Sequence, residues 1–220
     1  MNEEKDVESF APVYEFDEQA AKQAEIGPRI TDTGKYLGRF TLARPVVSPK
    51  KGTHGIAFNF INDDDEREAN YLTLWTADKE GKILRMGHNA VMALMALMGL
   101  DKLALENVTY EEYDLEEKKM VEVEGKAFTG MMDKPIGLVL QKQLYTKEDG
   151  SDGSRMSIYG MFDHETGKSA SEKLDGNEPE YIDKVLKGLG DDDQRSKSVA
   201  PEKVQEEEIA SDNFDDDIPF

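Results

Sequence analysis

The order of the periodic segments constrains this fold more than any other feature of the sequence. Three segments near the start, residues 35–47, 55–61 and 70–77, read as strands because they are rich in β-branched and aromatic residues. The middle segment alternates most strictly, at the two-residue period of a strand. Its two faces would carry Ile56, Phe58 and Phe60 on one side and Ala57, Asn59 and Ile61 on the other. Three consecutive strands of this kind predict a mainly β domain.

A short apolar helix is expected after the third strand. In residues 87–100, "GHNAVMALMALMGL", Asn89 is suited to cap the start of a helix and Gly99 to end it. Two more strands are expected at 135–146 and 154–162. Three strands, a helix and two strands follow the order of an OB-fold, a five-stranded Greek-key barrel with a short helix between strands three and four. Another small barrel or sandwich would also fit the pattern.

Composition divides the chain into three parts. Residues 1–28 form an acidic N-terminal extension. Residues 29–190 hold the expected OB-fold, with an insertion at 104–130 in which "EGKAFTGMM" reads as a further strand. This part ends in an amphipathic helix that would pack on the barrel through Tyr181, Ile182, Val185, Leu186 and Leu189. Residues 191–220 lack apolar periodicity and are expected to be a disordered acidic tail.

The net charge of −20 argues at first against nucleic acid, because phosphates need local Lys and Arg. The charge is concentrated at the two ends, however. Residues 1–25 carry eight acids and two bases, and residues 191–220 carry eleven acids and three bases. Between Arg29 and Gly55, six bases stand against one acid. A basic stripe acts within a Debye length of about 10 Å, so the acidic average does not exclude a cationic groove.

No catalytic chemistry is indicated by the motifs. The three histidines, His54, His88 and His164, lack the spacing of metal ligands. Residues 162–169, "FDHETGKS", end like a phosphate loop, but Phe162 stands where such a loop needs its first glycine. The absence of cysteine excludes disulfides and thiolate zinc sites. We therefore expect no enzyme, no metal and no cofactor.

The sequence also predicts a soluble cytoplasmic protein. Residues 1–10, "MNEEKDVESF", lack the basic and apolar parts of a signal peptide. The longest apolar stretch, residues 90–100, is much shorter than the roughly 20 residues that cross a bilayer.

Outward-facing aromatic and basic side chains are the main functional signal. If Leu72 and Leu74 point inward, Tyr71 and Trp75 stand on the outer face, and Trp75 is the only tryptophan. Unpaired bases stack on such rings at about 1–3 kcal/mol each, while cations follow the phosphates. Each ring would otherwise be packing material. The predicted contacts to single-stranded DNA are Arg39, Arg44, Lys50, Lys51, His54, Asn59, Tyr71, Trp75, Lys142, Tyr145, Arg155 and Tyr159.

The end of the sequence points to the same chemistry. Residues 213–220, "NFDDDIPF", resemble the C-terminal tip of bacterial and bacteriophage single-stranded DNA-binding proteins, and residues 34–60 and 87–100 resemble the bacteriophage members. The resemblance implies sequence-tolerant coating of single strands during phage DNA replication, recombination or repair, in the cytoplasm of an infected bacterial host cell. It also implies a tip that recruits polymerase, primase, helicase or exonuclease proteins. The tip residues are Asp215, Asp216, Asp217, Ile218, Pro219 and Phe220.

Two other functions remain open from the sequence. A strand-annealing recombination mediator would pair complementary strands as well as cover them, and an OB-fold protein–protein adaptor would use its tail without binding DNA. A homo-oligomer is compatible with the sequence. Because the acidic tail is tethered near a basic groove, we expect it to occupy that groove in part when DNA is absent.

Overall fold

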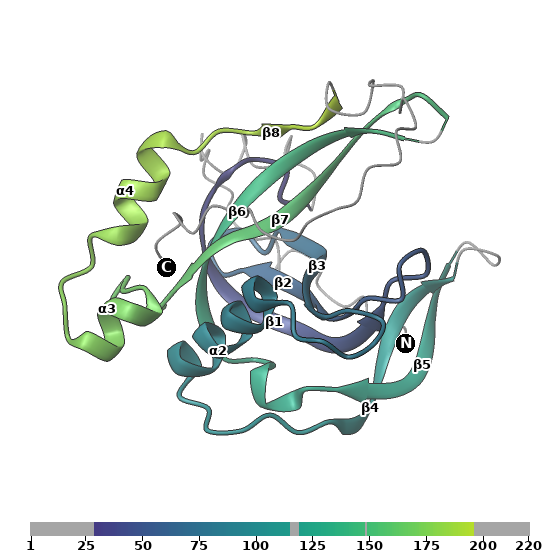
Figure 1. The fold of residues 1–220 in the computed structure, drawn as a ribbon, viewed down its shortest axis with the longest axis horizontal. Helices are drawn as coiled ribbons and strands as arrows, with labels where there is room; N and C mark the ends of the chain where they lie inside the picture. The colour runs from purple at the N-terminus through teal and green to yellow at the C-terminus, as the bar shows by residue number, and fades with distance from the viewer. Residues whose placement is uncertain (1–28, 115–118, 148, 196–220) are drawn as a thin grey trace, which may run out of the picture.

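The protein is mainly β, as the sequence predicts (Figure 1). The computed structural model describes residues 29–114, 119–147 and 149–195. Its strands are β1 (Gly34–Val47), β2 (His54–Asn62), β3 (Glu68–Ala77), β4 (Glu106–Asp114), β5 (Lys119–Ala127), β6 (Pro135–Thr146), β7 (Asp152–Phe162) and β8 (Asp192–Asp193). Its helices are α2 (Arg85–Met98), the short 3-10 helix η2 (Thr129–Met131), α3 (Ala170–Asp175) and α4 (Tyr181–Gly188).

The main sheet has the strand order β3-β2-β1-β6-β7, and β8 adds to β6. Its centre is the long strand β1, which pairs with β6 through residues 34–39 and with β2 through residues 38–47. A bulge between Phe40 and Leu42 interrupts this ladder, and bulges bend a strand and increase its twist. The edge strands β3 and β7 come into contact, but no ladder joins them among the described residues, so the sheet is not closed into a barrel.

The core lies on the inner side of this curved sheet. Phe40, Phe58, Phe60 and Leu72 are fully buried there, which confirms the alternation expected in the first three strands. The ring centroids of Phe40 and Phe58 are 4.5 Å apart. Helix α2 supplies the remaining wall of this core, chiefly through the buried residue Leu94.

Helix α2 begins earlier than Asn89, the cap expected from the sequence. Its first residue is Arg85, Leu84 stands at the cap position, and Asn89 is an exposed residue within the helix. The early start follows from packing on β3: a Cβ atom on Gly87 would lie 1.9 Å from the carbonyl oxygen of Trp75. The end at Gly99 is as expected, with this glycine in the left-handed conformation at φ 65°.

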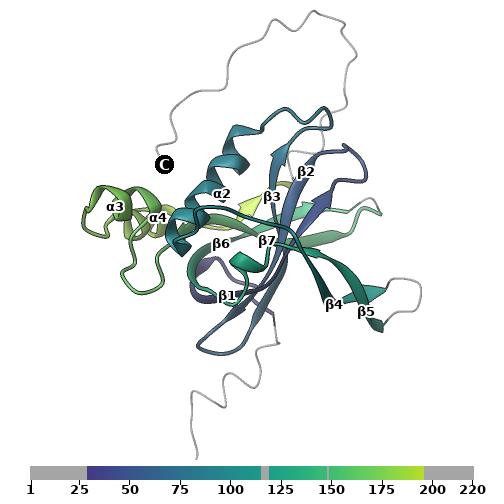
Figure 2. The same cartoon turned by 90° about the horizontal axis from the view of Figure 1, so that it is seen from below.

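The expected insertion at 104–130 forms the β4–β5 hairpin, which projects from the main sheet (Figure 2). Only the start of "EGKAFTGMM" is strand, because β5 ends at Ala127 and η2 follows. The base of the hairpin is fixed by two hydrogen bonds. The Phe128 amide donates to the Ala43 carbonyl at 2.7 Å, and the Thr129 hydroxyl donates to Glu106 at 2.6 Å.

The expected C-terminal helix is present as α4 and packs on the sheet. Its residue Ile182 is 2% exposed and lies against Val139 and Phe162, which point away from the main core. The sequence analysis did not identify α3, although Ser169 and Glu172 carry the spacing of a capping box.

The chain continues past residue 191, where the tail was expected to begin. Residues 192–193 form β8, the Gln194 amide donates to the Leu144 carbonyl at 2.8 Å, and Arg195 forms an ion pair with Asp152 at 2.8 Å. Residues 1–28 and 196–220, with the expected tip, lie outside the described residues.

Candidate nucleic-acid interface

Strand register arranges the outer face of β1, β2 and β3 in rows. One row holds Val46, Gly55 and Trp75, and the next holds Arg44, Ala57 and Thr73. The third row holds Leu42 and Asn59 opposite a bulge that contains Tyr71. The predicted outward rings are exposed: Trp75 by 39% and Tyr71 by 58%. The small residues of β2 between these rings and β1 are largely covered: Gly55 and Ala57 are buried, and the Trp75 ring lies close against Gly55.

Two loops meet beside Trp75 and carry four lysines. Gly52, in the β1–β2 loop, sits so close to the β3–α2 loop that a Cβ atom on it would lie 3.0 Å from the Cβ of Lys79. Residues 48–53 and 78–82 are called the lysine loops here. Their cations are Lys50, Lys51, Lys79 and Lys82. Exposed Val47 and His54 flank them, so the structure brings the predicted residues Lys50, Lys51, His54 and Trp75 to one end of the sheet.

The sequence analysis missed Lys79 and Lys82. Both follow directly on the strand that carries Trp75, and this adjacency was the available signal. Lys79 also contacts Glu80 at 3.4 Å, an exposed ion pair of the kind that contributes little.

Three further predicted residues, Asn59, Tyr71 and Arg155, line one groove of about 600 Å³. It lies between the start of β3, strand β7 and the β4–β5 hairpin, which contributes Met120 and Glu111. Tyr71 has φ 61°, and its amide donates to Asn59 Oδ1 at 3.2 Å. The left-handed conformation is costly for a tyrosine, and such strain is often found at functional sites.

The remaining predicted residues lie elsewhere or are committed to other contacts. Arg39 lies near the far end of β2, where it pairs with Asp63 at 3.1 Å. Arg155 stacks on the Tyr145 ring at 5.6 Å, and Tyr145 itself is half-buried. Lys142 is half-buried in β6, where it pairs with Met156 of β7.

Tyr159 and Arg44 complete the set of predicted residues. Tyr159 sits in a bulge of β7, beside α4. Burial of Tyr181, the first residue of α4, raises the pKa of its hydroxyl, and the nearby Tyr159 adds to this effect. Arg44 is on the outer face as expected, but its guanidinium forms an ion pair with Glu112 of the hairpin.

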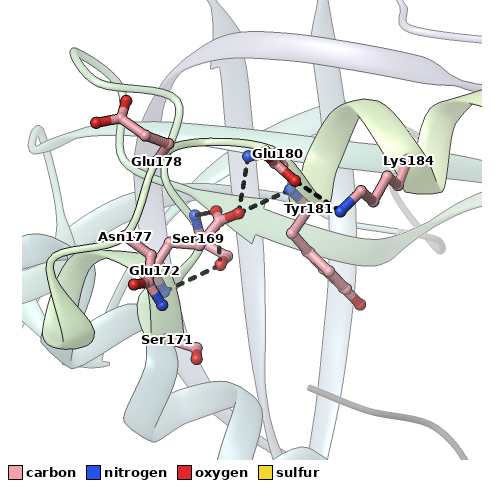
Figure 3. Close-up of a pocket in the computed structure, with 8 residues that line it drawn as sticks. All are labelled: Ser169, Ser171, Glu172, Asn177, Glu178, Glu180, Tyr181 and Lys184. Atoms are coloured by element: carbon pink, nitrogen blue, oxygen red, sulfur yellow. Dashed lines mark hydrogen bonds and ion pairs between the residues drawn. The ribbon is translucent and has the colours of Figure 1, made fainter.

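A second pocket, of about 570 Å³, lies between α3 and α4 and is explained by structure alone (Figure 3). Glu172 occupies its centre. Its carboxylate accepts hydrogen bonds from the Ser169 amide at 2.8 Å, the Glu180 amide at 2.8 Å and the Tyr181 amide at 2.7 Å. Partial desolvation alone would raise the pKa of Glu172, but these bonds outweigh it and lower the pKa to about 2. The polar groups of this pocket therefore hold the α3–α4 connection together.

Comparisons with known proteins do not assign a family. No family model matches the chain, and no curated protein matches it. Within the residues that the structure describes, no cluster of three or more His, Cys, Asp or Glu side chains is arranged to hold a metal ion. No helix in that part of the chain is long and apolar enough to cross a membrane. The candidate site is the outer face of β1, β2 and β3, which carries the exposed Trp75 and Tyr71 rings beside the lysine loops.

Proposed function

We propose that the protein binds single-stranded DNA without sequence preference on the outer face of β1, β2 and β3. One observation carries this proposal: the exposed Trp75 ring stands beside the lysine loops, over a floor of small residues. A ring face accepts any unpaired base, and flanking lysines accept any phosphate. This combination favours a single strand over a duplex, whose bases are already stacked on each other.

The strand order supports an OB-fold as the architecture of this site. In the order β3-β2-β1-β6-β7, the first strand of the chain is central, and α2 comes between the third strand and β6. In a Greek-key barrel of this kind, the β4–β5 hairpin would be an insertion after the helix. In such folds, the loop between the first two strands commonly contacts oligonucleotides, and here it is one of the lysine loops.

The biological setting follows from the same proposal. The protein would coat single strands during phage DNA replication, recombination or repair in the cytoplasm of a bacterial host, without catalysis or a cofactor. The segment from Asp215 to Phe220 would recruit replication or repair proteins. In that segment, Ile218 and Phe220 offer apolar anchors, Pro219 lowers the entropy cost of ordering, and the aspartates attract basic surfaces.

The experiment is a titration with oligo-dT monitored by tryptophan fluorescence. Trp75 is the sole tryptophan, so its emission reports this site alone, and we expect it to be quenched on binding. Replacing Trp75 by Leu should weaken binding by about fivefold or more, the equivalent of about 1 kcal/mol of stacking. Tyr159→Leu is the matched control: the sequence also predicted this ring as a contact, but it is exposed on β7 beside α4 and not on the proposed face. Binding that leaves Trp75 emission unchanged, or equal effects of both substitutions, would refute the proposed site.

A further inference from the structure

Arg44 is the cation at the middle of the outer face, and residues of the β4–β5 hairpin contact its guanidinium. Its register partner in β2 is Ala57, one row from Gly55 and Trp75. Its guanidinium donates a hydrogen bond to the Glu112 carboxylate. The same guanidinium lies 5.8 Å from the centroid of the Tyr110 ring. An arginine placed beside Trp75 in this way would otherwise be available to DNA.

The hairpin presents a distinct face to Arg44. Pairing sets Tyr110 opposite Val123 and Glu112 opposite Val121, so these four side chains share one face. All four are half-buried. The Tyr110 ring lies across Gly125, where a Cβ atom would approach it to 2.8 Å. Of these four side chains, only Glu112 is a carboxylate.

We propose that Arg44 and Tyr110 form a second nucleotide-binding subsite, in which Glu112 takes the place of a DNA phosphate until DNA displaces it. This inference rests on the proposed function. Carboxylates and phosphates are bound by a guanidinium in the same manner, through charge-assisted hydrogen bonds. The Tyr110 ring lies across Gly125 and under the Arg44 guanidinium, so a base would stack on it only when Arg44 turns from the ring to a phosphate.

The energetics permit the exchange. The side chain of Arg44 is 21% exposed and that of Glu112 is 36% exposed, so solvent reaches both. Partly exposed ion pairs of this kind contribute about 1 kcal/mol or less, because water and salt screen them. The hairpin also has a second attachment to β1, since the Phe128 amide donates to the Ala43 carbonyl. A phosphate can therefore replace Glu112 at a small cost.

The test compares Glu112→Gln with Glu124→Gln in the full chain. Glu124 is the matched control, because it stands opposite Thr109 on the other face of the same hairpin and both changes remove one negative charge. Glu112→Gln should tighten oligo-dT binding by about threefold to tenfold at low salt, which corresponds to about 1 kcal/mol for the lost competitor. Its salt dependence should steepen by about 0.7 in log–log slope, the value for one added phosphate contact to a single strand. Glu124→Gln should change the affinity less than about twofold, because it removes only a screened, distant charge.

A second substitution tests the ring. Tyr110→Leu in the Glu112→Gln background should weaken binding again by about fivefold, the loss of one stacked base. Equal effects of the two glutamine variants would overturn the inference, because charge alone would then explain them. Weaker binding by Glu112→Gln would also overturn it. In either case, Trp75-dependent binding by the unmodified chain would leave the proposed function standing. No binding by any variant would refute both.

Discussion

Tyr71 keeps a backbone conformation that its side chain disfavours. Its φ of 61° falls in the left-handed region, where a residue with a Cβ atom pays about 1–2 kcal/mol. The bulge opposite Asn59 imposes this geometry and turns the ring outward, to 58% exposure. A glycine would fill the same backbone position without strain. The ring is therefore retained at a cost in stability, which argues for a role in binding.

Replacing Tyr71 by Gly should separate stability from binding. We expect the free energy of unfolding to stay within about 1 kcal/mol of the unmodified protein, because relief of strain offsets the greater entropy of the unfolded chain. Affinity for oligo-dT should fall about fivefold or more with the loss of one stacking face. Denaturant unfolding and a binding titration measure the two quantities. Tyr159→Gly, in the β7 bulge, should leave affinity unchanged, and a fall equal to that of Tyr71→Gly would contradict the prediction.

Because of Glu172, the stability of the folded protein depends on pH. Its pKa of about 2 in the folded protein lies below the ordinary value of 4.5, so the unfolded chain takes up the proton first as the pH falls. The contribution of Glu172 is therefore fully present above about pH 5 and is lost progressively between about pH 4.5 and pH 2.

Glu172→Gln tests this contribution. The glutamine directs an NH2 group at backbone amides that need an acceptor, so we expect a loss of about 1–3 kcal/mol at pH 7. The difference from the unmodified protein should shrink at pH 2.5, as measured by denaturant unfolding at each pH. Glu178→Gln is the control, because Figure 3 shows this side chain in the same pocket pointing away from Glu172. A difference that does not depend on pH would rule out the carboxylate as its cause.

At the scale of the elements, the contact between α2 and β3 fixes the strand that carries Trp75. The first turn of the helix approaches so closely that only a glycine fits at position 87, against the Trp75 backbone. The helix therefore supports, from the inner side, the strand whose outer side is the proposed binding surface.

Two glycine-to-alanine changes in helices should shift the free energy of unfolding in opposite directions. Gly87→Ala should destabilise the protein by about 1–3 kcal/mol or more, because the added methyl group meets backbone rather than a flexible side chain. Gly188→Ala in α4 meets nothing within 4 Å and should be neutral or stabilising by up to about 1 kcal/mol. Thermal unfolding of both variants checks the pair. A neutral Gly87→Ala would mean that α2 does not press on β3.

The strands of the main sheet could be predicted because burial imposes a local pattern. Phe58, Phe60 and Leu72 are fully buried, and their neighbours in sequence face outward, as the alternation indicated. The start of α2 could not be predicted, because it depends on a tertiary contact at Gly87. The hairpin was ambiguous because Glu111 pairs directly with Glu122, and like charges opposite each other oppose strand formation.

The same distinction applies to the candidate site. The parity of β3 indicated the exposed rings of Tyr71 and Trp75. The meeting of the two lysine loops and the approach of Tyr110 to Arg44 join residues far apart in the sequence, and no local pattern encodes them. Arg39 was predicted from its charge alone, and its ion pair with Asp63 joins β1 to the turn after β2, which the charge pattern does not encode.

At the scale of the whole molecule, charge is divided between the ends and the sheet. Residues 196–220 carry eight acids and two bases, whereas residues 29–55 carry six bases and one acid. Arg195 forms ion pairs with Asp152 and Asp193. A truncation should therefore be made after Arg195 and not at residue 190, to leave β8 intact.

Removal of residues 196–220 should increase affinity for oligo-dT at low salt. A tethered acidic segment competes with DNA for the lysine loops at high local concentration, and salt screens this competition. We expect a gain of about tenfold at low salt, or about 1.4 kcal/mol, that disappears toward 1 M salt. A salt series on the full and truncated chains measures it. Identical affinities at low salt would exclude competition by the tail.

Among the described residues, the seam between β3 and β7 is held by packing and not by a strand ladder. Residues 29–31 lie along the start of β3 at this seam. The Ile30 amide donates a hydrogen bond to the Glu68 carbonyl at 2.8 Å. Tyr71 stands on one margin of the seam and Arg155 on the other. Their separation can therefore change without breaking any inter-strand ladder among the described residues. Under the proposed function, such a change in separation would admit thin and bulky bases alike, which would favour binding without sequence preference.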